Sequence, residues 1–535
     1  MTWQKSLLII TEYVKCHHPF NMSLQLKIDI LGIESGGKSV VFLNKADADE
    51  IGVTASGRVI LKSKKGITAI VNVATKSVKK GHIGITEEIR LLLGSVPSTI
   101  DVEISAFPKS LQFIRAKLDG KKLLRNEIFE IVRGVVTGNL NESEIASFVT
   151  ALHIHGIDLD EATSLSLAMV ETGKQLKLGN RIIVDKHSIG GVPGDKTTLL
   201  VVPIVAAAGL VIPKTSSRAI TSAAGTADRG EVLMPVSMTY DEMKKVVRKC
   251  NGCLVWGGAL DLAPADDIFI KTEYPLYIDP LLLPSIMSKK KAVGATHLVI
   301  DIPTGRGSKV KTISEADYLA KDLIEIGKRL DIHTHCVVTY GEQPVGYTVG
   351  PALEAKEALE VLMNESNVPD LIDKACSIAG AIFEITGKKN GYALAKDIIK
   401  TGKAEAKLRE IISAQGGNSS IKPDDIPIGS ETFKVKAKSE GQMLWISNSA
   451  IVEIARSAGA PKDKGAGIIF NKKIGDPVSR DDILFTVYAE KSRKLSRAHD
   501  LLKELEPIGV GKRADMMIRT IKEIPTVKRS FVLER

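Results

Sequence analysis

Alternating hydrophobic and polar positions predict that the chain begins with a β-rich unit. Over residues 24–30, leucine and isoleucine alternate with polar neighbours, which is the period of a half-buried strand. Further short strands are predicted at 39–43, 58–61, 68–73 and 100–104, together with a helix at 86–93. We therefore expect a small β-rich N-terminal domain over 22–105, with a small barrel as its candidate form. Residues 1–21 are interpreted as a tail or as the product of a misassigned start.

The spacing of apolar residues changes to that of helices after Phe107-Pro108. Helices are predicted at 126–138, 145–152 and 158–173. Asn141 has the character of an N-cap, and Glu144 three residues later completes a capping box. Short loops between such helices favour antiparallel neighbours. These features predict an all-helical subdomain over 106–178.

Strand-like apolar runs then alternate with glycine-rich turns and helices. Such runs occupy 181–184, 254–256, 297–302 and 337–339. They predict an α/β domain over 179–420 with a central mixed or parallel sheet and a helical return near 262–292. A helix is predicted at 199–208, kinked or delayed by Pro203. Period-two alternation at 433–437 and 483–487 predicts an α+β C-terminal domain over 421–535, so the fold class is multidomain α/β.

Composition narrows the class of protein. The chain has 535 residues, of which 44% are hydrophobic and 25% charged, an ordinary balance for a multidomain globular protein. The net charge of +10 is modest and aromatic residues make up only 4%, so we expect no nucleic-acid partner. No apolar run approaches the roughly 18 to 20 residues of a membrane span. The five cysteines form no disulfide framework, and a cytoplasmic protein without a membrane partner is predicted.

The segment from Val184 to Thr198 has the composition of an anion-binding loop. It joins a predicted strand to an apolar helix, and its glycines allow backbone N–H groups to approach an anion at a helix N-terminus. Lys186 supplies a point charge, while Ser188 and Thr198 supply hydroxyl donors. A P-loop would require glycine directly before the lysine, but Asp195 precedes Lys196. A phosphate site of another kind is predicted here.

A second hydroxyl-rich segment follows about 30 residues later. Its hydroxyl residues, Thr215, Ser216, Ser217, Thr221 and Ser222, surround Arg218. A guanidinium can clamp a phosphate through two parallel hydrogen bonds. Clusters of serine and threonine also cap helices without binding any ligand. Because two such loops lie so close in sequence, we expect them to form two sides of one site.

Five segments carry a family resemblance, namely VDKHSIGGVPGDKTT, KTSSRAITSAAGTAD, GCLVWGGALDLAPADD, SIMSKKKAVGATH and DIPTGRGSKVK. They resemble the thymidine/pyrimidine-nucleoside phosphorylase family, and within it the archaeal-type AMP phosphorylase branch, over about residues 24–520. That branch carries an extra N-terminal domain, which matches the predicted β-rich unit. The resemblance implies attack of inorganic phosphate on the anomeric carbon of a nucleoside or nucleotide. It implies no metal and no cofactor apart from phosphate as co-substrate, and a homodimer or larger homo-oligomer.

The resemblance also implies roles for individual residues. The family's phosphate-binding positions correspond to Lys186, Ser188, Thr198, Ser216 and Thr226. Nucleotide contacts correspond to Gly191, Ser217, Arg218, Ala219, Ile220, Thr221, Ser222, Thr226, Ser285 and Lys309. Asp279 matches the proton donor to the leaving base, a role that needs a pKa raised by burial or by a nearby anion. Its apolar flanks allow such burial, and His187 and Lys289 are further candidates for the site.

Substrate choice depends on a missing arginine. The pyrimidine branch grips its base with an arginine shortly before the serine that Ser285 matches, but no arginine stands between Asp266 and Ser285. AMP, with CMP or UMP as further substrates, is therefore favoured. Thymidine phosphorolysis is the alternative within the family. An anthranilate-type phosphoribosyltransferase is the alternative of another class, and it would need a magnesium-diphosphate site.

Some positions depart from the family pattern or point to other chemistry. Asp195 stands where AMP-type relatives usually carry asparagine, so this carboxylate either points away from the loop or weakens anion binding. Arg229-Gly230 replaces a Thr-Met pair at the expected pocket rim. Cys250 and Cys253 form a CxxC, which is weak support for zinc because no second close pair accompanies it.

Overall fold

The computed structural model describes residues 23–63, 66–179, 182–219 and 222–511, and the chain forms two compact units. Unit 1 contains the chain up to Lys177, together with Asp261–Gly294 and Glu325–Asp331. Unit 2 contains Leu178–Leu260, Ala295–Ile324 and the chain from Ile332 onward. Within the described residues, no helix is both long and apolar enough to cross a membrane.

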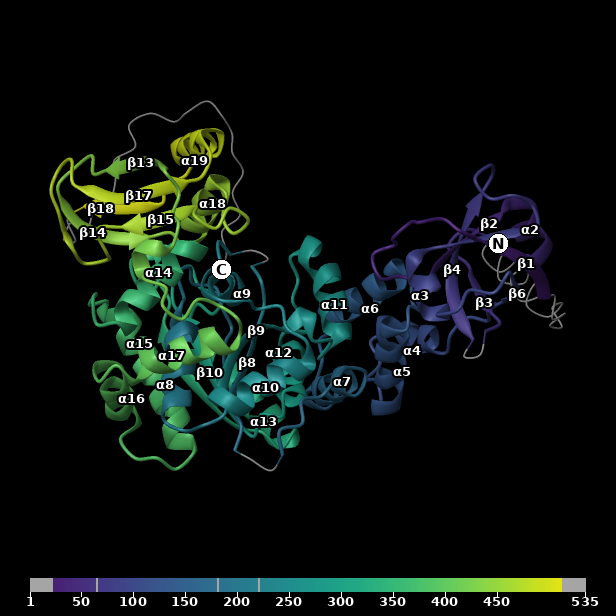
Figure 1. The fold of residues 1–535 in the computed structure, drawn as a ribbon, viewed down its shortest axis with the longest axis horizontal. Coiled ribbons are helices and arrows are strands. Elements are labelled where there is room, and N and C mark those ends of the chain that lie inside the picture. The colour runs from purple at the N-terminus through teal and green to yellow at the C-terminus, as the bar shows by residue number, and fades with distance from the viewer. Residues whose placement is uncertain (1–22, 64–65, 180–181, 220–221, 512–535) are drawn as a thin grey trace, which may run out of the picture. The chain divides into compact units, whose positions relative to one another are not determined.

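Unit 1 begins with a closed β-barrel, drawn in purple in Figure 1. Its strands, in spatial order, are β1 (Ser23–Ile30), β5 (His82–Ile85), β2 (Val40–Asn44), β4 (Ile67–Ala74), β3 (Arg58–Leu61) and β6 (Thr99–Ile104). Leu26, Val41 and Val71 are completely buried inside it, as their period-two spacing requires. The predicted β-rich domain and its candidate barrel form are confirmed. The prediction missed β5 and the helix α2 (Lys45–Ile51), while the predicted helix is α3 (Glu87–Leu93).

A helical bundle follows in the same unit. Its helices are α4 (Ser110–Leu118), α5 (Arg125–Val136), α6 (Glu142–His155), α7 (Leu159–Glu171), α11 (Pro264–Glu273) and α12 (Leu282–Ala292). The predicted capping box is present, because Asn141 Oδ1 accepts from Glu144 N at 3.0 Å and Asn141 N donates to the Glu144 carboxylate at 2.8 Å. Phe148 of α6 packs against Phe269 of α11 with ring centroids 6.0 Å apart. The late segment α11–α12 thus completes the core of the bundle.

Unit 2 is built on a parallel sheet. β10 (His297–Thr304) pairs in parallel with β7 (Val184–Ser188) and with β11 (His333–Tyr340), and β8 (Ile212–Ser216) pairs in parallel with β9 (Gly252–Trp256). A parallel bridge between Ile183 and Val211 places β8 beside β7. The helices of this part are α8 (Thr197–Ala207), α9 (Thr226–Leu233), α10 (Tyr240–Cys250), α13 (Ile313–Arg329), α14 (Pro351–Leu362), α15 (Pro369–Ile385), α16 (Gly391–Lys400) and α17 (Lys403–Ala414).

Of the two effects expected of Pro203, a kink or a delay of α8, the delay is absent. The helix is not delayed, since it starts at Thr197 and continues through Pro203 to Ala207. Every residue of α8 from Thr197 to Ala206 is buried. Tertiary packing on all sides therefore outweighs the local cost of a proline inside the helix.

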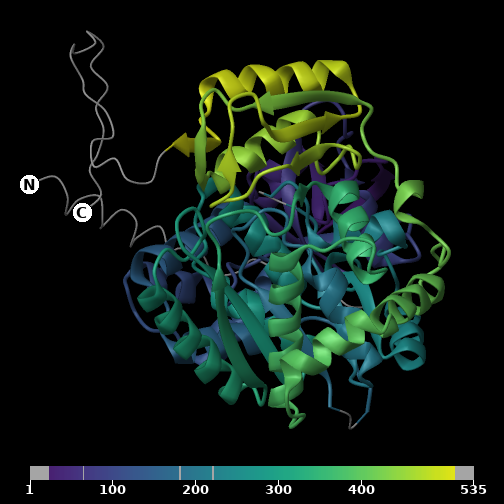
Figure 2. The ribbon, with the colours of Figure 1, turned by 90° about the vertical axis from the view of Figure 1, so that its left-hand side faces the viewer.

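The C-terminal part of unit 2 contains two small sheets and two helices. The strands are β12 (Thr348–Val349), β13 (Glu431–Lys436), β14 (Gly441–Ile446), β15 (Gly467–Phe470), β16 (Pro477–Val478), β17 (Ile483–Ala489) and β18 (Ile508–Gly511), with α18 (Asn448–Ala458) and α19 (Ser492–Glu504). Figure 2 shows α19 as the yellow helix that lies along the strands of this part. Both strands predicted from period-two alternation are present as β13 and β17, which pair antiparallel.

Candidate active site

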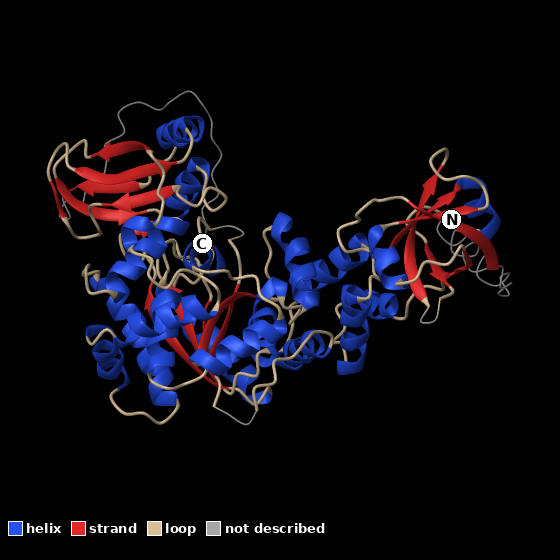
Figure 3. Ribbon diagram, in the orientation of Figure 1, coloured by secondary structure: helices blue, strands red, loops and turns tan. Residues whose placement is uncertain are grey.

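The carboxyl ends of the parallel strands in unit 2 carry most of the predicted site residues. β7 ends at Ser188 and β8 ends at Ser216, while β10 leads into the turn that contains Lys309. Because the strands are parallel, these ends share one edge of the sheet, seen among the red strands of Figure 3. Open α/β sheets bind their ligands at this edge. The fold therefore brings the two hydroxyl-rich loops to one side of unit 2.

Lys186 lies on β7, two residues before the first of these loops, with its ammonium group held in place. Its Nζ donates to Thr197 Oγ1 at 3.1 Å, and only 3% of the residue is exposed. Burial lowers the pKa of Lys186, against the charges of Asp195 and Asp301, which raise it. A buried cation beside the first turn of α8 is a suitable partner for an anion.

The other predicted phosphate residues of this loop lie around the same helix start. Ser188 Oγ accepts from Gly190 N at 3.4 Å, and Thr198 is buried in the first turn of α8. His187 is half-buried at the end of β7. The end of β7 and the start of α8 thus carry the lysine and the two hydroxyl groups on either side of one connecting loop.

The negative charge of Asp195 is balanced by a neighbouring lysine. Lys374 of α15 lies with its Nζ 3.2 Å from Asp195 Oδ2 and 3.0 Å from Asp301 Oδ2. Asp195 Oδ1 also accepts from Thr197 Oγ1 at 2.5 Å. Burial alone would raise the pKa of Asp195, but Lys374 and Lys186 hold it well below its usual range. The carboxylate therefore belongs to the turn, and Lys374 supplies the compensating charge.

The second loop is closed around one buried carboxylate. Asp228 Oδ2 accepts from Ala219 N at 2.7 Å and from Gly225 N at 2.9 Å. A Cβ on Gly225 would lie 2.4 Å from Ala219 N, so only glycine fits there. Thr226 begins α9, and Ser216 Oγ donates to the carbonyl of Val255 at 3.1 Å. Ala227 N donates to the carbonyl of Ser217 at 3.2 Å. This hydrogen bond joins the two ends of the loop, so that Ser217 lies close to the start of α9 at Thr226.

Arg218 does not have the geometry of the proposed phosphate clamp. Glu231 binds it bidentately, at 2.6 and 2.8 Å, and Asp228 accepts from it at 3.2 Å. These hydrogen bonds raise the pKa of Arg218 further above its usual range. Two carboxylates from α9 therefore occupy the guanidinium in this structure, and the contact of Arg218 with the nucleotide stays a prediction. The predicted contacts Ile220 and Thr221 lie outside the described residues, and Ser222 Oγ donates to the carbonyl of Ala224 at 3.2 Å.

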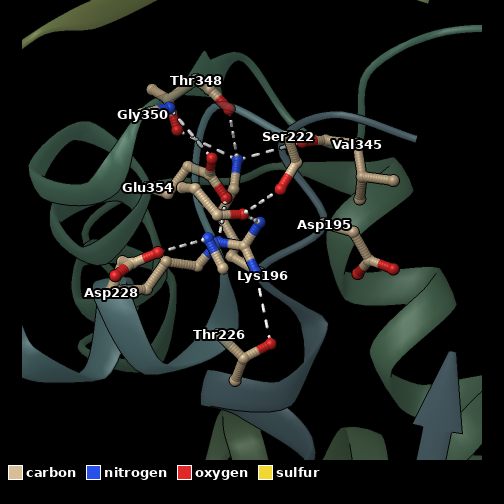
Figure 4. A network of polar contacts seen from close by, with 12 residues as sticks. Asp195, Lys196, Ser222, Thr226, Asp228, Val345, Thr348, Gly350 and Glu354 are labelled. Carbon is tan, nitrogen blue, oxygen red and sulfur yellow. Dashed lines mark hydrogen bonds and ion pairs between the residues drawn. The ribbon is translucent and has the colours of Figure 1, made fainter. Parts of the chain in front are cut away.

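Two glutamates of α14 anchor both loops, a feature that sequence reasoning missed. Glu357 pairs with Lys196, which also donates to the carbonyl of Val345 at 3.0 Å and to Thr348 Oγ1 at 3.0 Å. Glu354 pairs with Arg229, which donates to the carbonyl of Ala224 at 2.9 Å. Figure 4 shows this network. The available signal was the two glutamates three positions apart, Glu354 and Glu357, whose spacing places them on one face of the helix PALEAKEALEVL.

Gly191 and Lys309 are brought together, as their common predicted role requires. Gly191 has a φ of +94°, and a Cβ there would lie 2.8 Å from Lys309 N. The turn of Lys309 is thus packed directly on the first loop. This contact is possible only for a glycine in the left-handed conformation.

Asp279 lies in unit 1, in the turn between α11 and α12, and the expected burial by its flanks was wrong. Asp279 itself is exposed, and Leu276 and Tyr277 are exposed by 51% and 88%. These two flanking residues belong to a tight turn in which Tyr277 adopts a left-handed φ of +54°. The buried carboxyl group beside this turn is that of Glu273, which accepts from Leu281 N at 3.3 Å. Burial and the nearby charge of Asp279 raise the pKa of Glu273 to about 8.

Ser285 and Lys289 share one face of α12 in the same unit. Lys289 Nζ donates to Ser285 Oγ at 3.5 Å and lies 2.5 Å from Asp266 Oδ2 of α11. Burial alone would lower the pKa of Lys289, but the charge of Asp266 and its hydrogen bond raise it. Glu273, Asp279, Ser285 and Lys289 thus form a polar cluster on α11, α12 and the turn between them.

Comparisons with known proteins agree with this architecture. Residues 111–173 match the helical bundle domain of a glycosyl transferase family, residues 180–405 match its α/β domain, and residues 444–509 match a pyrimidine nucleoside phosphorylase C-terminal domain. An AMP phosphorylase of Thermofilum pendens is 48% identical over 516 residues, covering 96% of this chain and 100% of the relative. One of Thermococcus kodakarensis is 49% identical over 497 residues, covering 91% and 98%. The chain belongs to the AMP phosphorylase family.

A solved structure of an anthranilate phosphoribosyltransferase from Thermus thermophilus is also similar to the chain. It has a TM-score of 0.49 and 20% identity, and the match covers 56% of this chain and 98% of that one. The match to the α/β domain of the glycosyl transferase family spans both loops and also Asp279, Ser285 and Lys289. The recognised resemblance and the multidomain α/β class are confirmed by the family matches, and the chain is a pentosyltransferase-type enzyme.

Proposed function

We propose that this enzyme cleaves nucleoside 5′-monophosphates, AMP foremost and CMP or UMP in addition, by phosphorolysis. The products are the free base and ribose 1,5-bisphosphate. The observation that carries the proposal is the pair of loops at the carboxyl edge of β7 and β8, with Lys186 buried beside the start of α8. The chain is 48% and 49% identical to two AMP phosphorylases over more than nine tenths of its length, and this similarity supports AMP as the substrate.

The reaction needs a held nucleophile and a protonated leaving group. An oxygen of orthophosphate forms a bond to C1′ while the bond from C1′ to the base nitrogen breaks, and the base takes up a proton. Lys186, Ser188, Thr198, Ser216 and Thr226 are proposed to hold the phosphate. Positioning of an anionic nucleophile against a cation-like sugar lowers the barrier through proximity and electrostatics.

Asp279 is proposed to donate the proton to the base. Ser285, Lys309, Gly191, Thr226 and the segment from Ser217 to Ser222 are proposed to contact the nucleotide. Lys289 is proposed to hold Ser285 in place through their hydrogen bond, since its charge is already taken up by Asp266. His187 remains a candidate for a supporting role at the end of β7.

A substrate panel tests the proposal. Base release is measured from AMP, CMP, UMP, adenosine and thymidine, each with and without inorganic phosphate. We expect the highest kcat/KM for AMP and no release without phosphate. A higher kcat/KM for thymidine would replace the proposed substrate, and release that does not depend on phosphate would remove the phosphorylase activity.

The proposal also covers the cofactor requirement, the cellular location and the oligomeric state of the enzyme. We propose that it needs no metal or other cofactor, so that a chelator leaves the rate unchanged. A cytoplasmic location is supported by the four free cysteines of the described residues, Cys250, Cys253, Cys336 and Cys376, since reduced thiols are typical of that compartment. A homodimer or larger homo-oligomer is proposed, which light scattering would test, and nucleic acid is not expected to bind.

A further inference from the structure

Arg229 lies one helical turn after Thr226 on α9, and its side chain is buried. The nitrogen atoms of its guanidinium group have different partners. Nε pairs with Glu354 of α14, while Nη2 donates to the carbonyl of Ala224 at 2.9 Å and Nη1 donates to Thr226 Oγ1 at 3.4 Å. Figure 4 shows the last of these hydrogen bonds as the dashed line that ends at Thr226. The partners together fix the guanidinium in one orientation.

The hydrogen bond from Arg229 leaves the proton of the Thr226 hydroxyl group for another acceptor. A threonine hydroxyl has one O–H to donate and accepts through its lone pairs. Thr226 Oγ1 accepts from Arg229, and within the part of the chain that the structure describes its own proton has no acceptor. Ser216, which is also proposed to bind phosphate, instead donates to the carbonyl of Val255 at 3.1 Å. Thr226 is half-buried at the start of α9, where the first helical turn favours an anion.

The charge of Arg229 also acts on the first loop. Burial lowers the pKa of Lys186, and the charge of Arg229 lowers it further. Burial raises the pKa of Asp195, whereas Arg229 is one of the cations that lower it. Interactions of this kind require charges that lie near one another in the protein interior. The guanidinium therefore lies close to the lysine that is proposed to hold phosphate.

We propose that Arg229 positions the hydroxyl group of Thr226 so that this group donates a hydrogen bond to the attacking orthophosphate. This inference rests on the proposed function. A hydrogen bond from a charged donor is stronger than one between neutral groups, and donation to Oγ1 polarises the O–H bond. Glu354 keeps the guanidinium in place through their ion pair. Arg229 is thus a positioning residue that acts through Thr226.

The test removes the guanidinium without leaving a buried charge behind. Arg229→Met/Glu354→Gln replaces both members of the pair, because the loss of one partner would leave the other uncompensated. Thr226→Val removes the hydroxyl group and keeps the shape of the side chain. The KM for phosphate is measured at saturating AMP for the pair variant, for Thr226→Val and for the triple variant. We expect a rise of about tenfold in each of the three, since Arg229 acts through the hydroxyl group that Thr226→Val removes.

A matched control removes a buried ion pair of unit 1. Lys117→Met/Glu161→Gln replaces a pair whose side chains are only 3% and 4% exposed, and its KM for phosphate should equal the wild-type value. Thermal unfolding verifies that each variant is folded. If Arg229→Met/Glu354→Gln does not fold, Arg229→Lys decides. Lysine keeps a cation beside Glu354 but lacks the planar fork that reaches several partners, so its KM for phosphate should rise about threefold or more, and an unchanged KM would overturn the inference.

The results separate this inference from the proposed function. If Thr226→Val raises the KM for phosphate and folded Arg229→Met/Glu354→Gln does not, the inference is wrong and the proposed phosphate site stands. A rise of about a hundredfold in the triple variant would show that Arg229 acts independently of Thr226, which also overturns the inference. An unchanged KM in Thr226→Val would overturn it as well. If the wild type releases base without any dependence on phosphate, the proposed function fails, and the inference fails with it.

Discussion

The ammonium group of Lys374 lies 3.2 Å from the carboxylate of Asp195. These residues are far apart in the sequence, on α15 and in the turn before α8, and both are almost completely enclosed. Lys374 also pairs with Asp301 on β10. A carboxylate can therefore stand in a loop proposed to bind phosphate, since a buried cation offsets its charge.

Removal of that cation should weaken phosphate binding. Lys374→Met leaves Asp195 and Asp301 without their common partner, and we expect the KM for phosphate to rise about tenfold or more. The double variant Lys374→Met/Asp195→Asn should recover part of this loss. Initial rates against phosphate concentration at saturating AMP measure both effects. Thermal unfolding verifies that each variant is folded, and a wild-type KM in folded Lys374→Met would show that the pair is unrelated to phosphate.

The contact between Gly191 and Lys309 yields a prediction with a built-in control. Gly190 and Gly191 both have positive φ, but a Cβ on Gly190 meets nothing within 4 Å, whereas one on Gly191 meets Lys309. Both alanine variants therefore carry similar backbone strain, about 1 kcal/mol, and only Gly191→Ala displaces the Lys309 turn. We expect Gly191→Ala to raise the KM for AMP by about tenfold more than Gly190→Ala does. Equal values for the two variants would contradict the proposed role of this contact.

Asp279→Asn tests the proposed proton donor. The amide keeps the size of the side chain but cannot give up a proton to the base, so kcat should fall by about 10² to 10⁴. Binding of AMP, measured by calorimetry, should change little. Asp331→Asn, which alters an aspartate exposed by 92% in the same unit, is the control and should keep the wild-type kcat. A kcat for Asp279→Asn within about twofold of wild type would exclude the assignment.

Glu273 should give the stability of the protein a pH dependence. Its pKa is raised from 4.5 to about 8 in the folded protein, so the folded state binds the proton more tightly than the unfolded state. The stability from this group is complete below its unfolded pKa and is lost as the pH rises to about 8. Glu273→Gln cannot ionise and lacks this loss. The midpoint of unfolding of the variant should therefore increase relative to wild type between about pH 5 and about pH 9, and a constant difference would contradict the assigned pKa.

The sequence predicted those structural features that depend only on residues close together in the chain. Asn141 and Glu144 form their capping box because both partners belong to one turn. The barrel strands and β13 with β17 follow from alternation, while β5 has only four residues and includes a glycine, which left too short a pattern to recognise.

Other features depend on residues that are distant in the sequence. The pairs of Arg229 with Glu354 and of Lys196 with Glu357 join positions more than a hundred residues apart, and no local pattern predicts them. The pairing of Arg218 with Glu231 was also missed, although the two residues are only 13 positions apart, because Glu231 lies beyond the loop on α9. The apolar residues beside Asp279 predicted burial, but the left-handed turn at Tyr277 leaves Leu276 and Tyr277 exposed.

The most direct test of the account follows the oxygen atoms of phosphate. AMP is incubated with the enzyme and ¹⁸O-labelled orthophosphate, and the sugar product is analysed by mass spectrometry. If the loops hold phosphate as the nucleophile, the product is ribose 1,5-bisphosphate that carries the label in its new 1-phosphate, and Lys186→Ala forms it far more slowly. Release of adenine with unlabelled ribose 5-phosphate, at a rate independent of added phosphate, would contradict the account.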